Sequence, residues 1–192
     1  MLYIFTKYDE NPKTISHIFL EQVLYKACLI ADAQKKLKRE SSGKPYVDSA
    51  VFSISHSKNA IAIAVLSDKD IMDVDFDFAD VLMIDTDADV KSIGVDIESI
   101  ADKKIERLKN IAKAKFFESE QKLLLNTNSD YEYVKGFCTI WTKKESFSKF
   151  TSIGMKDALK FDSQKLRSDI KLYTDVISVG GEEYALSLCY NS

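Results

Sequence analysis

The sequence is poor in cysteine and has no long apolar run. Its three cysteines are scattered and form no CxxC motif, so four thiols for a metal site are lacking and reduced cysteines are expected. No window approaches the roughly 18 consecutive apolar residues of a membrane span. The first residues also lack the basic start and long apolar core of a signal peptide. These absences predict a cytoplasmic protein that has no membrane partner.

Positive charge is not in excess either. The chain has 27 Lys and Arg against 30 Asp and Glu, which gives a formal net charge of -3. A general nucleic-acid binder would usually be basic, so no nucleic-acid partner is expected. With 192 residues, 45% of them hydrophobic, the chain can build one sizeable core or two small halves that share one.

The apolar patterns predict strands and helices in mixed order. Strands are expected over 2–8, 51–56, 60–66, 93–98, 170–179 and 183–190, and helices over 14–38, 102–111, 119–125 and 129–150. Asp102 and Ser119 are the expected N-caps of two of these helices, and Ser129 to Glu132 fits a capping box. This order predicts an α+β fold of two similar α/β halves, 1–93 and 94–192, that form a pseudo-dimer.

An acidic segment interrupts the first half at about 67–91. Residues 67–90 contain nine aspartates and a single lysine, Lys69. A calcium loop starting at Asp73 is rejected because Phe78 and Ile84 stand where the loop needs glycine and glutamate. A solvated loop or hairpin that projects outward is expected instead.

Two carboxylates stand in an apolar run, Gly94–Glu98 (sequence GVDIE). Asp96 and Glu98 lie two positions apart, so in a strand they point to the same side, roughly 6–7 Å from one another. That spacing suits two oxygen ligands of a hard cation such as Mg²⁺. Taken alone, the pair is equally well explained as an exposed strand face.

The segment Trp141–Lys149 adds a third carboxylate, Glu145, with Lys149 one helical turn later. Such a Glu–Lys pair alone is routine on helix surfaces. Trp141 is expected to pack rather than to stack on a ligand. Three carboxylates beside lysines nevertheless describe a site for a divalent metal and a phosphorylated ligand.

Two further motifs precede these acids. Gly43–Tyr46 (GKPY) is a turn that offers Lys44 on a rigid loop. His56 ends a predicted strand between two serines, where it could donate a hydrogen bond to a phosphate or cap the turn. For His17, near a helix start with no polar company, a structural role is favoured.

In this order and spacing the motifs resemble those of the 4′-phosphopantetheinyl transferase family. The series continues with 115–117 (KFF) and with 141–149, which matches the family pattern W-x-x-K-E-x-x-x-K. Asp96 and Glu145 are 49 positions apart (145 minus 96), within the family's usual range. The 93 residues before Gly94 resemble the larger, monomeric, surfactin-synthetase-activating type rather than the smaller trimeric holo-acyl-carrier-protein synthases.

The resemblance implies an enzyme that moves the phosphopantetheine arm of coenzyme A to a serine of an apo acyl or peptidyl carrier protein. The carrier could serve fatty acid, polyketide or nonribosomal peptide synthesis, and 3′,5′-ADP is released. Mg²⁺, or Mn²⁺, would be held by Asp96, Glu98 and Glu145. Glu145, directly or through a water, would be the general base, and Lys149 would stabilise developing charge.

The resemblance also implies contacts to coenzyme A and to the carrier. Lys144 would help hold the phosphates, Ser55 and His56 would contact the 3′-phosphate, and Lys44 and Pro45 would line the adenine side. The carrier would dock near the helix after residue 102 and near 115–117.

The chain departs from the family pattern at two places. His56 and Asp96 are 40 positions apart (96 minus 56), which is unusually long. Only 42 residues precede Gly43, so Lys7 and Lys13 are the candidates to replace basic residues that the family uses there against the 3′-phosphate.

Two alternatives stay open. A non-catalytic coenzyme A or carrier-protein binding homologue would predict loss of the metal carboxylates or of Lys149, and all are present. A general Mg²⁺ phosphohydrolase would explain the acids but not 43–45 or 55–57.

Overall fold

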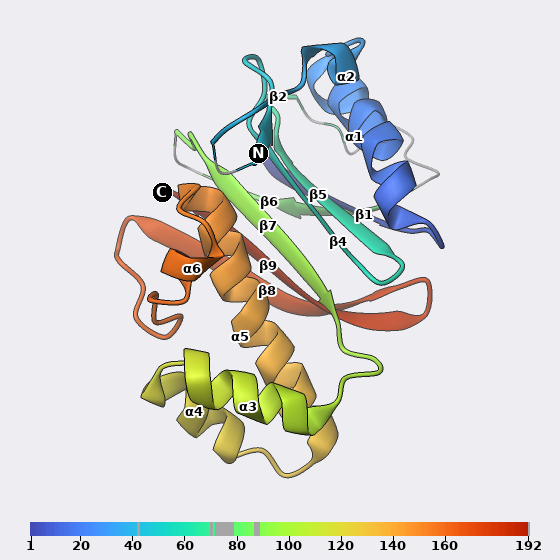
Figure 1. Ribbon diagram of the computed structural model, residues 1–192. Helices are drawn as coiled ribbons and strands as arrows, with labels where there is room; N and C mark the ends of the chain where they lie inside the picture. The colour runs from blue at the N-terminus through green and yellow to red at the C-terminus, as the bar shows by residue number, and fades with distance from the viewer. Residues whose placement is uncertain (42, 70, 72–78, 87–88, 192) are drawn as a thin grey trace.

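The computed structural model describes residues 1–41, 43–69, 71, 79–86 and 89–191. It contains a four-stranded sheet of order β4-β5-β1-β6, a three-stranded sheet of order β7-β9-β8 and a short β2-β3 pair. Every strand pairing in these sheets is antiparallel. The mixed α+β class predicted from the sequence is confirmed (Figure 1).

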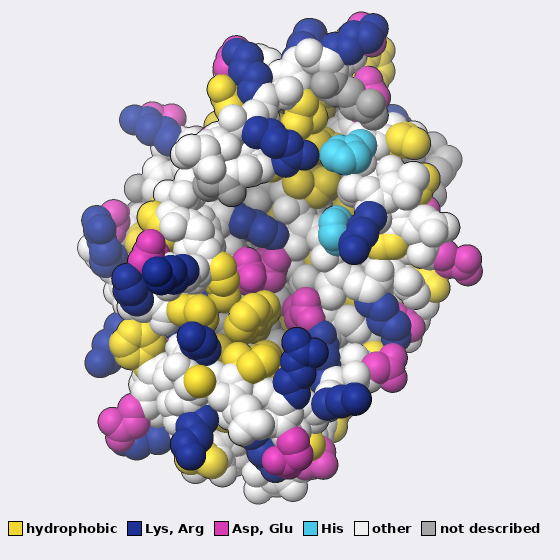
Figure 2. Space-filling view, in the orientation of Figure 1, with side chains coloured by type: hydrophobic (Ala, Val, Ile, Leu, Met, Phe, Trp, Pro, Cys, Tyr) yellow, Lys and Arg dark blue, Asp and Glu magenta, His cyan; other side chains and the backbone are white. Residues whose placement is uncertain are grey.

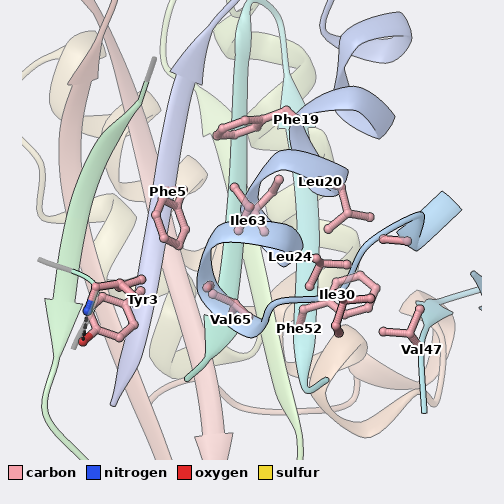
Figure 3. Close-up of a cluster of buried hydrophobic side chains, with 14 of the residues drawn as sticks. Tyr3, Phe5, Phe19, Leu20, Leu24, Ile30, Val47, Phe52, Ile63 and Val65 are labelled. Carbon is pink, nitrogen blue, oxygen red and sulfur yellow. Dashed lines mark hydrogen bonds between the residues drawn. The ribbon is translucent and has the colours of Figure 1, made fainter. Parts of the chain in front are cut away.

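The first sheet comprises β1 (Leu2–Tyr8), β4 (Phe52–Ser57), β5 (Ala60–Leu66) and β6 (Asp80–Ile84). Helix α1 (Pro12–Cys28) covers one face of it. Figure 3 shows the core between them, where aromatic and aliphatic side chains of the helix meet those of the strands. The opposite face of this sheet packs on the second sheet.

The alternation of β1 explains why both faces are buried. Tyr3 and Phe5 belong to the core under α1, whereas Leu2 and Ile4 belong to the core between the sheets. Successive strand residues point to opposite faces. An uninterrupted apolar strand is therefore what a layer covered on both sides requires.

The second sheet comprises β7 (Ile93–Ser99), β8 (Ile170–Val179) and β9 (Glu182–Asn191), and the long helix α5 (Asp130–Thr151) packs against β7 and β9. The helix approaches very closely at Gly94. A Cβ there would lie 2.0 Å from the backbone oxygen of Ser146, so no larger residue fits without moving the helix.

The two sheets repeat one topology. In each, a strand is followed by helices and then by a hairpin, and the first strand pairs with the second hairpin strand: β1 with β5, and β7 with β9. The exact boundary between two halves at 93/94 stays a prediction.

Shorter elements connect these layers. They are α2 (Ala33–Lys36), β2 (Lys38–Arg39), β3 (Pro45–Tyr46), α3 (Ile105–Lys115), α4 (Glu118–Leu125) and α6 (Met155–Ala158). None of the helices in the described part of the chain is long and apolar enough to cross a membrane.

Several predicted boundaries were wrong, for local reasons. The first helix ends at Cys28 because Leu29 adopts a left-handed conformation with φ of 55°. Asp102 has φ of 58° and precedes α3 without capping it. Ser119 lies inside α4, and the N-cap is instead Phe117, whose backbone N–H donates to the Glu120 carboxylate. The Ser129 cap is confirmed, since its hydroxyl accepts from the backbone N–H of Glu132.

Part of the acidic segment also differs from expectation. Residues 80–84 form the edge strand β6, which pairs with β1 from Leu2↔Ile84 to Thr6↔Asp80, rather than a loop that projects outward. Residues 72–78, which include the rejected calcium loop start at Asp73, lie outside the described residues.

Candidate active site

The three predicted metal carboxylates and Lys149 line one pocket of about 450 Å³. Asp96 and Glu98 come from β7, and Glu145 and Lys149 come from α5. The apolar residues that alternate with the acids, Ile93, Val95 and Ile97, are buried in the core between the sheets. The strand pattern therefore directs the acids toward α5 and the pocket, as predicted.

Asp96 is a buried carboxylate with two partners. Its Oδ1 accepts from Ser55 Oγ at 2.7 Å and from Lys149 Nζ at 2.8 Å. Lys149 also donates to the backbone oxygen of Val95 at 3.0 Å. Burial raises the pKa of Asp96, an effect that the adjacent Lys149 and the Ser55 hydroxyl oppose. The exposed strand face considered from the sequence does not apply to this residue, which is only 6% exposed.

Glu98 is partly exposed and also has two partners. It forms an ion pair with Lys103, and its Oε2 accepts from Ser57 Oγ at 3.0 Å. Each of the two β7 acids is thus held by one lysine and one serine.

Glu145 is influenced by the charges of both β7 acids and of Lys149. The pKa of Glu145 is raised to about 7, chiefly by burial and then by the charges of Asp96 and Glu98, against the opposing effect of Lys149. A carboxyl group that titrates near neutral pH can accept a proton under ordinary conditions.

The opposite wall of the pocket comes from the first sheet and its connections. It contains His17, Arg39, Pro45, Ser55 and His56. Figure 2 shows the two histidines beside a hollow in which acidic side chains are visible. The pocket therefore has an acidic side and a side that carries a guanidinium and two imidazoles.

His17 and Arg39 were not predicted as site residues. His17 was expected to be structural, yet it lies on α1 and lines the pocket. Arg39 is placed there by the β2-β3 pair, where its guanidinium donates to the backbone oxygen of Gly43 at 2.9 Å. The sequence signal for Arg39 was its position four residues before Gly43, at the start of the predicted turn. Lys7 and Lys13 do not line the pocket.

Serines of β4 join the two sheets beside the acids. The backbone N–H of Val95 donates to Ser53 Oγ at 3.0 Å, and that of Ser99 donates to Ser57 Oγ at 3.1 Å. With Ser55 on Asp96, three alternate residues of β4 thus contact β7. The Ser55 hydroxyl, predicted to contact a phosphate, here holds a carboxylate.

Lys44 lies beside a second pocket of about 300 Å³, which shares Pro45, Glu145 and Lys149 with the first. Its ammonium donates to the backbone oxygen of Ile93 at 3.0 Å. Burial lowers the pKa of Lys44. Lys44, predicted to line the adenine side of coenzyme A, thus lies in a pocket that Glu145 also lines.

Lys144 is not brought to the pocket, and here the sequence prediction needs correction. Its side chain is fully buried and pairs with Glu120 at 2.9 Å. In this arrangement the ammonium faces away from the pocket that Glu145 lines, so the predicted phosphate contact is not supported.

Trp141 both packs and lines the pocket. Its ring stacks on that of Phe137 with centroids 6.0 Å apart, which agrees with the packing role predicted for it. It also borders two hollows along α3, of about 430 and 610 Å³, which are lined by Lys103, Lys104, Arg107, Ile111 and Lys115 among others.

The donor set suits a divalent cation, although the side chains are not arranged around one. Among the described residues, no three His, Cys, Asp or Glu side chains are close enough together to hold a metal ion as they stand. The carboxylate oxygens of one pocket are nevertheless the ligands that Mg²⁺ prefers. The pKa of Glu145 is raised first by burial and then by the charges of Asp96 and Glu98, and a cation bound among the three acids would relieve that repulsion.

Comparison with known proteins places this site in a family. No curated protein sequence matches the chain significantly. The family model of the 4′-phosphopantetheinyl transferase superfamily (ACPS) matches residues 92–189, which include β7, α5 and the four charged residues on the acidic side of the pocket. Because the match spans half of the chain, this protein belongs to the 4′-phosphopantetheinyl transferase superfamily.

Proposed function

We propose that the protein transfers the 4′-phosphopantetheine arm of coenzyme A to a serine of an apo carrier protein and releases 3′,5′-ADP. The observation that carries the proposal is the convergence of Asp96, Glu98, Glu145 and Lys149 on one pocket whose other wall carries Arg39 and two histidines. Coenzyme A has a diphosphate and a separate 3′-phosphate. A pocket with charged groups on two walls can bind both.

Mg²⁺, or Mn²⁺ in its place, would be held by Asp96, Glu98 and Glu145. Bound there, the cation neutralises charge on the diphosphate and acts as a Lewis acid. To offer Oδ1 as a ligand, Asp96 would have to release Lys149, and to offer Oε1, Glu98 would have to release Lys103. Lys149, once released, lies beside the same pocket and can stabilise the charge that develops on the departing phosphate.

Glu145 would act as the general base, directly or through a water. The carrier serine oxygen attacks the phosphorus that bears the pantetheine arm, and its proton passes to the carboxylate of Glu145. The bond from that phosphorus to the bridging oxygen breaks, and 3′,5′-ADP leaves. A pKa near 7 keeps a useful fraction of Glu145 ionised at neutral pH.

The first-sheet wall would hold the rest of coenzyme A. Arg39, His17 and His56 would contact the 3′-phosphate, and Lys44 and Pro45 would line the adenine side. Arg39 and His17 take the place that Lys7 and Lys13 held as sequence candidates. Ser55 would act indirectly, by orienting Asp96.

The carrier protein, acyl or peptidyl, would dock along α3. Lys103, Lys104 and Arg107 border a hollow that shares Glu98 and Trp141 with the pocket, so a basic surface adjoins the site. Such a surface complements an acidic carrier. We further propose that the enzyme works as a monomer of the surfactin-synthetase-activating type in the cytoplasm, in keeping with its three free cysteines.

The test is to incubate the protein with coenzyme A, Mg²⁺ and a panel of apo carriers, and to weigh the carriers by mass spectrometry. Addition of the arm to a serine is expected with the natural protein and not with Glu145→Ala. Exposed Glu10→Ala is the matched control and should transfer normally. Binding of coenzyme A without transfer to any carrier would instead favour the non-catalytic homologue, and phosphate release from unrelated nucleotides would favour a phosphohydrolase.

A further inference from the structure

Lys144 and Glu120 form a fully buried ion pair outside the pocket. Lys144 Nζ lies 2.9 Å from Glu120 Oε1, and both side chains are 0% exposed. The ammonium also donates to the backbone oxygen of Phe161 and lies 5.0 Å from the centre of the Phe117 ring. The Lys144 ammonium thus contacts a carboxylate, a backbone carbonyl and an aromatic ring, all within the protein.

Glu120 connects the pair to two further segments. Its Oε2 accepts from the backbone N–H of Phe117 at 2.8 Å, at the start of α4. Its Oε1 accepts from the backbone N–H of Ser163 at 2.9 Å, beyond α6. Three stretches of chain, 116–120, 144 and 161–163, therefore meet at one pair of opposite charges. Because a charged hydrogen bond is directional, such a junction fixes orientation as well as distance.

Lys144 lies next to Glu145 on α5, so the junction at Lys144 bears on the orientation of this helix. Glu145 and Lys149 are four residues apart and share one helix face, which lines the pocket. Lys144 points about 100° away from Glu145 around the helix. Gly94 sets how closely α5 approaches β7, and Thr142 contacts Ser187 at 2.8 Å on the sheet side. The buried pair secures the helix from another direction and so opposes its rotation about its own axis.

We propose that Lys144 and Glu120 are positioning residues that hold α5 in the rotation at which Glu145 and Lys149 face the pocket. The inference rests on the proposed function. For Lys144 to contact a phosphate instead, its ammonium would have to leave the junction, and Glu120 would remain as an unpaired buried charge. Breaking a buried pair in this way is strongly unfavourable.

The test is a double-mutant cycle with Lys144→Met, Glu120→Met and the double variant, assayed where circular dichroism shows each to be folded. A positioning role predicts that kcat falls at least tenfold in each while KM for coenzyme A stays within about twofold, because a small misplacement of reacting groups is costly. The double variant should be no slower than the slower single variant. Lys122→Met, an exposed lysine of α4, is the control and should keep both constants within about twofold of the natural protein.

Each other outcome overturns the proposal. A tenfold rise in KM in both variants that lack Lys144, but not in Glu120→Met, would show a direct phosphate contact. Unchanged kcat and KM in the folded double variant would show a purely structural pair. If the single variants do not fold, the double variant alone decides, because it contains no unpaired buried charge and should fold.

A second measurement separates this inference from the proposed function. If the natural protein binds no coenzyme A by calorimetry and transfers nothing, the proposed function fails. Urea unfolding still tests the junction in that case: the double variant should be more stable than either single variant. Additive losses of stability would contradict the coupling.

Discussion

The two sheets repeat one topology, yet they bring different chemistry to the pocket. The second sheet and its helix α5 supply carboxylates and a lysine, whereas the first sheet and its connections supply hydroxyls, imidazoles and a guanidinium. Where β4 meets β7, serine hydroxyls of β4 donate hydrogen bonds to the two acids of β7 and accept hydrogen bonds from backbone N–H groups of β7. The comparison suggests that the acidic side carries the reaction and that the other side orients it and binds the ligand.

The largest effect is expected at Gly94, where the second sheet meets α5. In Gly94→Ala the new Cβ would lie 2.0 Å from the Ser146 oxygen and 2.4 Å from the Phe150 nitrogen, both backbone atoms that cannot rotate away. We expect a loss of about 2–3 kcal/mol in the free energy of unfolding, measured in urea, as for overpacked cores, and a loss of transfer activity.

Gly136→Ala on the same helix is the matched control. Its Cβ would meet only a flexible side-chain atom of Leu124 at 2.9 Å. An equal loss in the two variants would contradict the special closeness of α5 and β7.

The next effect concerns the acids of the second sheet. The folded protein raises the pKa of Glu145 from 4.5 to about 7, so it binds that proton more tightly than the unfolded chain does. The resulting stability is present below pH 4.5 and is lost as the pH rises through 7. In metal-free buffer, Glu145→Gln should therefore stabilise the protein by about 1–2 kcal/mol above pH 7 and have little effect near pH 4.

Urea unfolding across this pH range measures the difference. Exposed Glu10→Gln should give no comparable pH dependence. A Glu145→Gln variant that is less stable than the natural protein at pH 8 would show that burial and the neighbouring acids do not disfavour the charged form of Glu145.

The ligand-binding side of the comparison is tested with Arg39→Ala. Removing the guanidinium should raise KM for coenzyme A about tenfold, near 1.4 kcal/mol, with little change in kcat. Dephospho-coenzyme A, which lacks the 3′-phosphate, should be used equally well by the variant and the natural protein. A similar rise in KM for both substrates would remove Arg39 from the 3′-phosphate contact.

The smallest effect is expected where the sheets meet. Ser53→Ala leaves the buried N–H of Val95 without its acceptor, and a loss of about 1 kcal/mol in the free energy of unfolding is expected. Ser49→Ala, at an exposed position, should leave stability unchanged. Equal values for the two would mean that the serine contacts contribute nothing to joining the sheets.

The sequence predicted the acidic side better than the opposite wall, for a physical reason. Strand alternation puts Asp96 and Glu98 on one side of a strand, and helical spacing puts Glu145 and Lys149 on one helix face, because these patterns are local; the order and spacing of the family motifs indicated that the two pairs form one site. The contacts of Ser53 and Ser57 with β7 join residues about 40 positions apart, and no periodicity indicates them.

Lys144 is a residue for which helical spacing is more informative than the family motif. Trp141, Glu145 and Lys149 recur every four residues and line the pocket together. A residue directly before Glu145 points to another face of the helix. The motif alone favours a phosphate contact, whereas the helical period places Lys144 on another face, which the structure shows to be buried. The edge strand β6 was missed because the aspartate-rich composition around it favours loops.

The most direct test of the account is a crystal structure of the protein with coenzyme A and Mg²⁺. The account predicts the diphosphate beside Lys149, with the cation between it and Asp96, Glu98 and Glu145, and the 3′-phosphate at Arg39. Coenzyme A bound away from these residues, for example in the hollows along α3, would contradict it.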